Sequence, residues 1–169
     1  SVCLILGDNI FHSDTFAHRY LLPSIQKKSP IVFGYHVSDP ERYGVVEFDA
    51  QDNVLSLEEK PVRAKSNYAI TGLYVFDKHA PSIAKGLTPS ERGELEIVDM
   101  LNYYLESNNL KVELLGRGVS WLDTGTHQSL HEASSYIEVL ENRQGLKIAC
   151  LEEIAFQKGY ISKGQLLSL

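Results

Sequence analysis

The chain has 169 residues, enough for one compact domain with a sizeable core, and 43% of them are hydrophobic, which excludes a disordered protein. Its net charge of −6 comes from mixed charges without a basic block, so neither nucleic acid nor an anionic membrane surface is an expected partner. No stretch approaches the about 18 apolar residues of a membrane-spanning helix, and no signal peptide is evident. Cys3 and Cys150 lack metal-ligand spacing and are expected to be small core residues in a reducing cytoplasm.

The chain opens with a short apolar run, residues 2–6, that stops at Gly7, Asp8 and Asn9. An apolar run bounded in this way predicts a strand buried on both faces, with Asp8 just past its C-terminal end. Open α/β sheets bind their ligands at that position. Because a central strand rarely begins a complete domain, we expect further sequence to precede this run in the parent protein.

Residues 13–35 predict a helix and then a second buried strand. Ser13 offers an N-cap, and Pro23 is expected to end or kink the helix. Residues 31–35 form the second short apolar run. The order strand, helix, strand indicates a sheet covered by helices.

Residues 45–49 and 54–61 alternate in polarity around a polar turn and predict a β-hairpin. Pro61 closes the hairpin because it cannot donate a hydrogen bond to a ladder. Glu59 and Lys60 then lie at the end of the strand, with their side chains on opposite faces. Such a pair can serve a ligand hydroxyl and a phosphate, or it can be an ordinary charged strand end.

Residues 68–76 give the strongest strand pattern, rich in β-branched and aromatic residues. Gly72 within them indicates a bulge, a close approach of a ligand to the backbone, or tight packing against a helix. The spacing then becomes helical, with Leu95, Val98, Leu101 and Leu105 at intervals of three and four residues. We expect Glu94 and Glu96 to lie in the first turn of this helix. Acidic residues there complement the helix dipole, so we expect helix initiation and not a metal site.

Residues 111–115 and 119–122 predict two more strands, the second of which runs directly into Asp123 and a glycine turn. Thr126 offers the N-cap of a following helix. The expected buried stripe of that helix consists of Leu130, Ala133, Ile137 and Leu140. We therefore predict one domain over residues 1–169, with a helical C-terminal segment from about residue 126.

Asp8 and Asp123 each follow a predicted buried strand and together offer two hard oxygen ligands. Mg²⁺ typically takes one or two protein carboxylates and completes its shell with water and phosphate oxygens. The pair would let an acidic protein hold a polyphosphate while the cation neutralises charge on a transferred phosphorus. Alternatively, each aspartate caps a turn or the next helix.

Six segments carry a resemblance to a known family. In order they read LGDNIF at 6–11, RYGV at 42–45, EEKP at 58–61, TGLY at 71–74, RGELEI at 92–97 and WLDTG at 121–125. They resemble the glucose-1-phosphate thymidylyltransferases, a branch of the sugar nucleotidyltransferases, over essentially the whole chain. The resemblance implies an α/β fold with a Rossmann-like mixed sheet flanked by helices, incomplete at the N-terminus.

The resemblance also implies a reaction: dTTP and α-D-glucose 1-phosphate give dTDP-glucose and pyrophosphate, with Mg²⁺ as cofactor. The product would supply dTDP-rhamnose and related cell-envelope sugars, and the family enzyme is a cytoplasmic homotetramer. Asp8 and Asp123 resemble its metal ligands, Lys60 the lysine that binds the sugar phosphate, and Glu59 the carboxylate that binds glucose hydroxyls. The residues expected to line the sugar pocket are Tyr43, Gly44, Thr71, Gly72, Tyr74 and Trp121.

One departure from the family matters. Family members bind the nucleotide through a Gly-rich loop and a base-recognition segment that precede the Asp8 motif, and neither is present in this chain. We therefore expect a C-terminal fragment that supplies the sugar-phosphate and metal half and is inactive alone. Two alternatives stay open: a UTP-using sugar-1-phosphate nucleotidyltransferase, and a non-catalytic domain that binds or senses sugar phosphates.

The missing segment would also affect the sheet. Without flanking strands, residues 2–6 would form an edge with unpaired backbone groups and exposed apolar side chains. We expect the chain to self-associate or to exchange strands through that edge.

Overall fold

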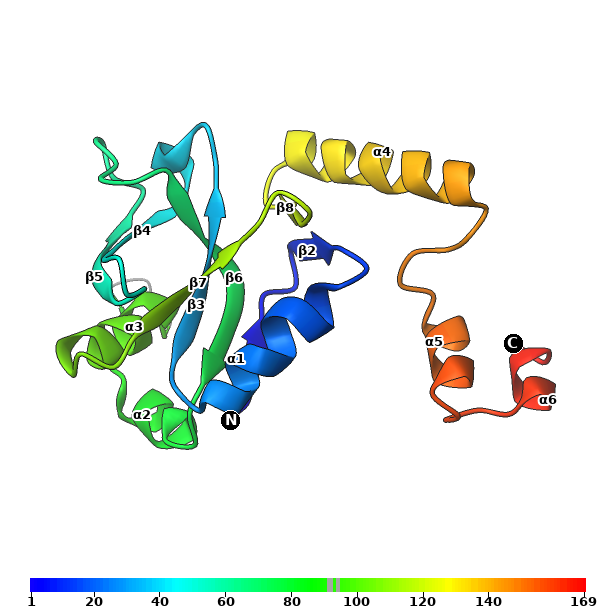
Figure 1. The fold of residues 1–169 in the computed structure, drawn as a ribbon, viewed down its shortest axis with the longest axis horizontal. Coiled ribbons are helices and arrows are strands. Elements are labelled where there is room, and N and C mark those ends of the chain that lie inside the picture. Colours follow the sequence, from blue (N-terminus) through cyan, green and yellow to red (C-terminus); the bar gives the residue numbers. More distant parts are fainter. Residues whose placement is uncertain (91–92, 94) are drawn as a thin grey trace. The chain divides into compact units, whose positions relative to one another are not determined.

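The computed structural model describes residues 1–90, 93 and 95–169. The expected place of Glu94 in the first turn of a helix lies outside the described residues. The chain divides into two compact units, Ser1–Asp123 and Thr124–Leu169 (Figure 1). This boundary lies close to residue 126, where the helical segment was expected to begin, and the single domain over residues 1–169 stays a prediction.

The first unit is built on a six-stranded mixed sheet with the order β5-β4-β6-β3-β7 and β1 added beside β6 (Figure 1). Its strands are β1 (Val2–Ile5), β3 (Ile31–His36), β4 (Gly44–Phe48), β5 (Val54–Glu59), β6 (Tyr68–Phe76) and β7 (Lys111–Leu115). Strand β6 is antiparallel to β1, β3 and β4, whereas β3 and β7 are parallel. The predicted hairpin is confirmed as β4 and β5.

A separate two-stranded ribbon pairs β2 (Asn9–His12) with β8 (Ser120–Asp123) in antiparallel register. We call it the β2–β8 ribbon. It aligns Asn9 with Asp123, and Phe11 with Trp121. The sequence indicated β8 but not β2, because a run of four residues after a turn carries little pattern of its own.

Helices cover both faces of the main sheet. Residues of α2 (Ala80–Gly86) and α3 (Ile97–Glu106) pack on one face, and residues of the π-helical turn η1 (Ala17–Leu21) and of α1 (Leu22–Lys27) pack on the other. A 3₁₀ turn, η2 (Pro40–Arg42), precedes β4. Pro23 does not end the helical run, which continues from Ala17 through η1 and α1 to Lys27, but the run changes from π-helical to α-helical beside it, between Leu21 and Leu22. Helix α3 begins after Glu96, which is its N-cap residue and not a member of its first turn.

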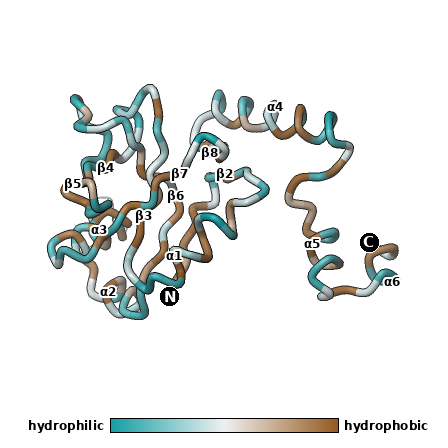
Figure 2. Tube along the Cα trace, viewed as in Figure 1, coloured by the Kyte–Doolittle hydropathy of each residue, from teal (hydrophilic) through white to brown (hydrophobic). Residues whose placement is uncertain are grey.

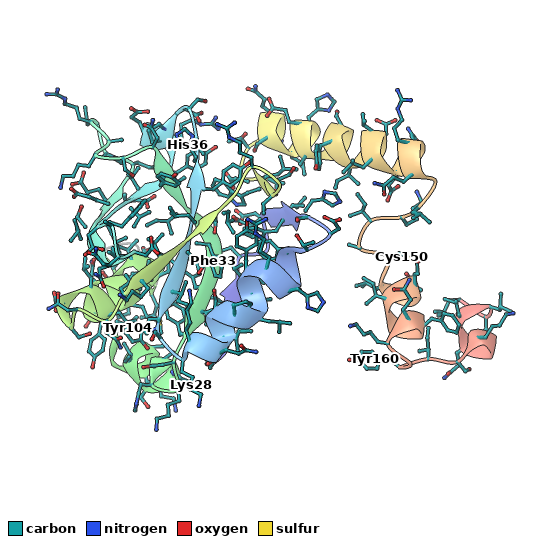
Figure 3. All side chains as sticks on the ribbon, viewed as in Figure 1. Lys28, Phe33, His36, Tyr104, Cys150 and Tyr160 are labelled. Carbon is teal, nitrogen blue, oxygen red and sulfur yellow. The ribbon has the colours of Figure 1, made fainter. Side chains whose placement is uncertain are left out.

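The core consists of two clusters, one on each face of the sheet, because alternate strand residues point to opposite sides. Val32, Tyr74 and Phe76 pack with the buried side chains of α3. Phe33 and its neighbours on the other face pack with Tyr20 of η1. Figure 3 labels Phe33 in β3 and Tyr104 on α3, and Figure 2 shows hydrophobic segments along the strands and the helix before β3.

Strand β1 is exposed, so the prediction of a strand buried on both faces is wrong. All four of its residues are exposed, with Ile5 at 55%, and among the described strands it pairs only with β6. An apolar run does not by itself distinguish a covered strand from an uncovered edge. The expected apolar edge is present, whereas Cys3 is exposed and is therefore not a core residue.

The second unit consists of α4 (His127–Gln144), α5 (Leu151–Gln157) and α6 (Lys163–Leu166). Thr126 caps α4 as predicted, in a capping box with Ser129. Of the expected buried stripe only Ala133 is buried, and Leu130 is 52% exposed. Neither α5 nor α6 has a buried residue. No helix in the described ranges is both long and apolar enough to cross a bilayer.

Candidate functional site

The β2–β8 ribbon brings the two predicted metal ligands to one place. Asp8 directly precedes β2, and Asp123 is the last residue of β8, aligned with Asn9. The described residues contain no group of three or more His, Cys, Asp or Glu side chains that could enclose a metal. Two carboxylates on one ribbon fit Mg²⁺, which takes most of its ligands from water and phosphate, better than a metal that needs a full protein cage.

Asn9 connects this ribbon to the main sheet. Its Nδ2 donates to Asp8 Oδ1 at 2.9 Å, and its Oδ1 accepts from Trp121 Nε1 at 2.7 Å. The same Oδ1 accepts from the backbone N–H of Gly72 at 3.0 Å. Asn9 was not among the predicted site residues, although it follows Asp8 directly as the first residue of β2. Only the folded chain shows that its amide joins three of the family segments.

Gly72 leaves the space that Asn9 fills. A Cβ atom built at Gly72 would lie 2.7 Å from Cγ of Asn9, closer than real carbon atoms approach. The backbone carbonyl of Gly72 also accepts from the N–H of Leu6 at 2.8 Å. The close approach expected at Gly72 is therefore made by a side chain of the protein itself.

The end of the β4–β5 hairpin carries the next group of predicted residues. Gly44 pairs with Glu59, and a Cβ at Gly44 would lie 3.0 Å from Glu59 Oε2. The ring of Tyr43 lies 5.3 Å from that of Trp121, centroid to centroid. Trp121 is 8% exposed. The hairpin and the β2–β8 ribbon thus meet through these two aromatic rings.

Lys60 follows β5 in a left-handed backbone conformation with φ at +45°. For a residue with a side chain such a conformation costs about 1–3 kcal/mol and persists where the surrounding structure holds it, often at functional sites. The N–H of Lys60 donates to the carbonyl of Tyr43 at 3.0 Å. The turn leaves Lys60 Nζ 3.9 Å from Glu59 Oε1 and leaves both side chains largely exposed. An exposed cation beside a carboxylate suits a ligand that offers a phosphate and hydroxyls.

Tyr74 lies in the electric field of carboxylates from both parts of the site. Burial raises the pKa of its phenol to about 12, and the negative charges of Glu59 and Asp8 add to the shift. The hydroxyl is therefore protonated at neutral pH and can donate a hydrogen bond. The shift also indicates that the hairpin carboxylate and the ribbon carboxylate act on the same region.

Arg42 belongs to the same region although it was not predicted as a site residue. It donates to Asp39 Oδ2 at 2.9 Å, and its guanidinium carbon lies 5.5 Å from the centroid of the Tyr43 ring. The hydrogen bond to Asp39 is the main cause of its raised pKa, and the charge of Asp123 adds a smaller contribution. A cation thus stands near one of the two predicted metal ligands.

Thr71 differs from its predicted neighbours. Its side chain is fully buried, and its hydroxyl has no hydrogen-bond partner among the described residues. The prediction that Thr71 lines the sugar pocket can therefore hold only for its backbone.

The mixed sheet flanked by helices and the paired carboxylates fit an enzyme that transfers nucleotidyl groups. The profile of the family described as "Nucleotidyl transferase" matches residues 1–139, and the chain belongs to this family.

Among curated proteins, "Glucose-1-phosphate thymidylyltransferase" of Neisseria gonorrhoeae is 54% identical over 163 residues, which cover 96% of this chain and 57% of that protein. The protein of the same name from Mycobacterium tuberculosis (strain CDC 1551 / Oshkosh) is 48% identical over 168 residues, covering 99% of this chain and 58% of that protein. The chain thus spans less than two thirds of the length of these relatives.

Solved structures agree with the fold. A Bacillus anthracis structure, described as a "Putative Glucose-1-Phosphate Thymidylyltransferase" in complex with a sucrose, superposes with a TM-score of 0.66 at 40% identity. The match covers 79% of this chain and 53% of that one. An apo UDP-glucose pyrophosphorylase superposes with a TM-score of 0.71 at 20% identity, covering 83% and 54%, and supports the fold alone. The predicted Rossmann-like mixed sheet is confirmed.

Proposed function

We propose that the chain forms the sugar-phosphate and metal half of a glucose-1-phosphate thymidylyltransferase. The reaction would join dTTP and α-D-glucose 1-phosphate into dTDP-glucose and release pyrophosphate. The observation that carries this proposal is the link through Asn9, which bonds the carboxylate of Asp8 and the indole of Trp121 in one cluster. The names of the relatives at 54% and 48% identity support the choice of substrates.

The chemistry needs no nucleophilic side chain. A phosphate oxygen of the sugar phosphate attacks the α-phosphorus of dTTP, the bond from that phosphorus to the bridging oxygen breaks, and pyrophosphate leaves with that oxygen. Most of the rate enhancement then comes from positioning and from stabilising charge. Asp8 and Asp123 would hold Mg²⁺, which supplies positive charge near the phosphates.

The remaining residues would hold the sugar phosphate. Lys60 would pair with its phosphate through Nζ, and Glu59 would accept hydrogen bonds from its hydroxyls. The protonated hydroxyl of Tyr74 can donate to a sugar oxygen. The rings of Tyr43 and Trp121 would form an apolar wall against the sugar ring. Gly44, Gly72 and the backbone of Thr71 would complete the pocket.

The metal role can be tested in a full-length protein that contains this chain. Replacing Asp123 by Asn should abolish Mg²⁺-dependent release of pyrophosphate from dTTP and glucose 1-phosphate, and near-normal turnover would refute the assignment. Residues 1–169 alone should give no product, since they span 57% of the length of the Neisseria gonorrhoeae relative. Turnover by this piece would show that it binds nucleotide unaided.

The nucleotide and the assembly belong to the same proposal. Only the names of the relatives favour dTTP over UTP, so initial rates with the two nucleotides should be compared in the full-length protein. A non-catalytic module would instead bind glucose 1-phosphate without ever releasing pyrophosphate. We also propose a cytoplasmic homotetramer, as the family resemblance implies. Apolar side chains exposed in the second unit, such as Leu151 at 75%, support self-association without setting the number of subunits. Analytical ultracentrifugation measures the assembly directly.

A further inference from the structure

We infer that the hydroxyls of Tyr20 and Tyr35 position the turn at residues 116–119, and through it the strand that carries Trp121 and Asp123. This inference rests on the proposed function. Neither tyrosine belongs to the segments that resemble the family, and neither was a predicted site residue. Both act through other groups, so they are positioning residues.

Two hydrogen bonds hold the turn from opposite ends. The N–H of Gly116 donates to Tyr20 Oη at 3.0 Å, and Tyr35 Oη donates to the carbonyl of Val119 at 3.1 Å. The turn itself is closed by a bond from the N–H of Val119 to the carbonyl of Gly116 at 3.0 Å. Each tyrosine therefore satisfies one backbone group at one end of the turn.

The two tyrosine hydroxyls lie in closely packed surroundings. Tyr20 is 5% exposed, Val119 is 2% exposed, and a Cβ at Gly116 would lie 3.0 Å from Tyr20 Oη. Tyr35 and Gly116 are half-buried and both bonds are partly buried, so losing either bond costs about the net contribution of one hydrogen bond. The Tyr35 ring also packs edge-on against Trp121, with centroids 5.6 Å apart. Packing alone would require only a phenyl ring, so the hydroxyls add control over the turn.

The turn is the junction between the main sheet and the β2–β8 ribbon. It follows Leu115, the end of β7, and precedes Ser120, the start of β8. Strand β7 pairs with β3 in the main sheet, whereas β8 pairs with β2. A shift of the turn therefore moves Asp123 relative to the Glu59 and Lys60 end of the hairpin, and it misplaces the metal relative to the sugar phosphate.

The test replaces each hydroxyl without changing the ring. Tyr20→Phe and Tyr35→Phe, made in a full-length protein that contains this chain, should each raise the Mg²⁺ concentration for half-maximal pyrophosphate release. The expected change is up to about tenfold, because the effect on the metal requirement cannot exceed the net free energy of the hydrogen bond that is lost. In residues 1–169, where Trp121 is the only tryptophan, the indole N–H resonance should shift in both variants.

Two controls separate positioning from stability. Tyr160→Phe changes a tyrosine that is 79% exposed and should alter nothing. Ile31→Val removes one buried methylene from the same core cluster, so it should lower the unfolding temperature while the Mg²⁺ requirement and the indole resonance stay at wild-type values.

The inference is overturned if both Phe variants keep the wild-type Mg²⁺ requirement and indole resonance, or if Ile31→Val changes them equally. If the full-length wild type shows no Mg²⁺-dependent reaction, the proposed function fails instead. The indole resonance then still decides the positioning role, because it needs no substrate.

Discussion

Replacing Asn9 by Ala should destabilise the first unit more than most single substitutions do. The change removes an acceptor from Trp121 Nε1 and from the N–H of Gly72, and a donor from Asp8. A buried polar group without a partner costs about 1–3 kcal/mol. Because water can enter part of the vacated space, we expect the free energy of unfolding to fall by about 2–4 kcal/mol.

The assay is urea denaturation followed by Trp121 fluorescence, which reports directly on this cluster because the chain has a single tryptophan. Asn9→Asp is the informative partner variant: its carboxylate still accepts from Trp121 and Gly72 but repels Asp8 where the amide donated. It should therefore lose less stability than Asn9→Ala. Asn142→Ala, an exposed change in α4, should leave stability nearly unchanged.

The reasoning is refuted if Asn9→Ala lowers the free energy of unfolding by less than about 0.5 kcal/mol, the size of an ordinary surface substitution. An unchanged Trp121 emission maximum in that variant would also refute the reasoning, because the loss of the Asn9 acceptor should change the surroundings of the indole.

Three further predictions concern the same region. Gly72→Ala should cost about 1–3 kcal/mol in denaturant unfolding, because its Cβ displaces Asn9, whereas Gly86→Ala, with open space around it, should not. Lys60→Gly should keep the free energy of unfolding within about 1 kcal/mol of wild type, since relief of the positive φ offsets the entropy of glycine. In a calorimetric titration, the dissociation constant of the same variant for glucose 1-phosphate should rise by about tenfold or more. An unchanged dissociation constant would contradict the proposed role of the Lys60 ammonium. Tyr74 has a folded pKa of about 12 against an ordinary 10.0, so its contribution to stability is complete below pH 10 and is lost as the pH rises toward 12. In an absorbance titration, Tyr74→Phe should show one fewer phenol that ionises at high pH than the wild type does.

The strands of the main sheet follow from patterns in the sequence, with one instructive error. Residues 68–76 and the hairpin were predicted at nearly their observed bounds, because alternation and turn residues are local signals. The prediction that β1 is buried was wrong, because the burial of an apolar strand depends on which elements pair with its free edge and pack on its faces. The predicted stripe of α4 is buried only at Ala133, because the burial of a helix face depends on what packs against it.

In the candidate site, too, some residues have a local signal in the sequence and others do not. Asp8, Asp123, Glu59 and Lys60 were indicated by their places at strand ends and by the family resemblance. Asn9 and Arg42 stand inside the family segments but were not predicted, because an amide that follows a turn and an arginine beside a tyrosine are common on protein surfaces.

The sequence alone determined which residue types stand at the ends of which strands, because strand periodicity, turn residues and caps are properties of short segments. Only the tertiary structure decided which strand ends meet. The β2–β8 ribbon aligns Asn9 with Asp123 across more than a hundred residues of chain, and Gly72 lacks a Cβ where Asn9 must enter. Such long-range contacts depend on the packing of the whole unit, where the hydrogen bonds of one amide join segments that no local pattern connects.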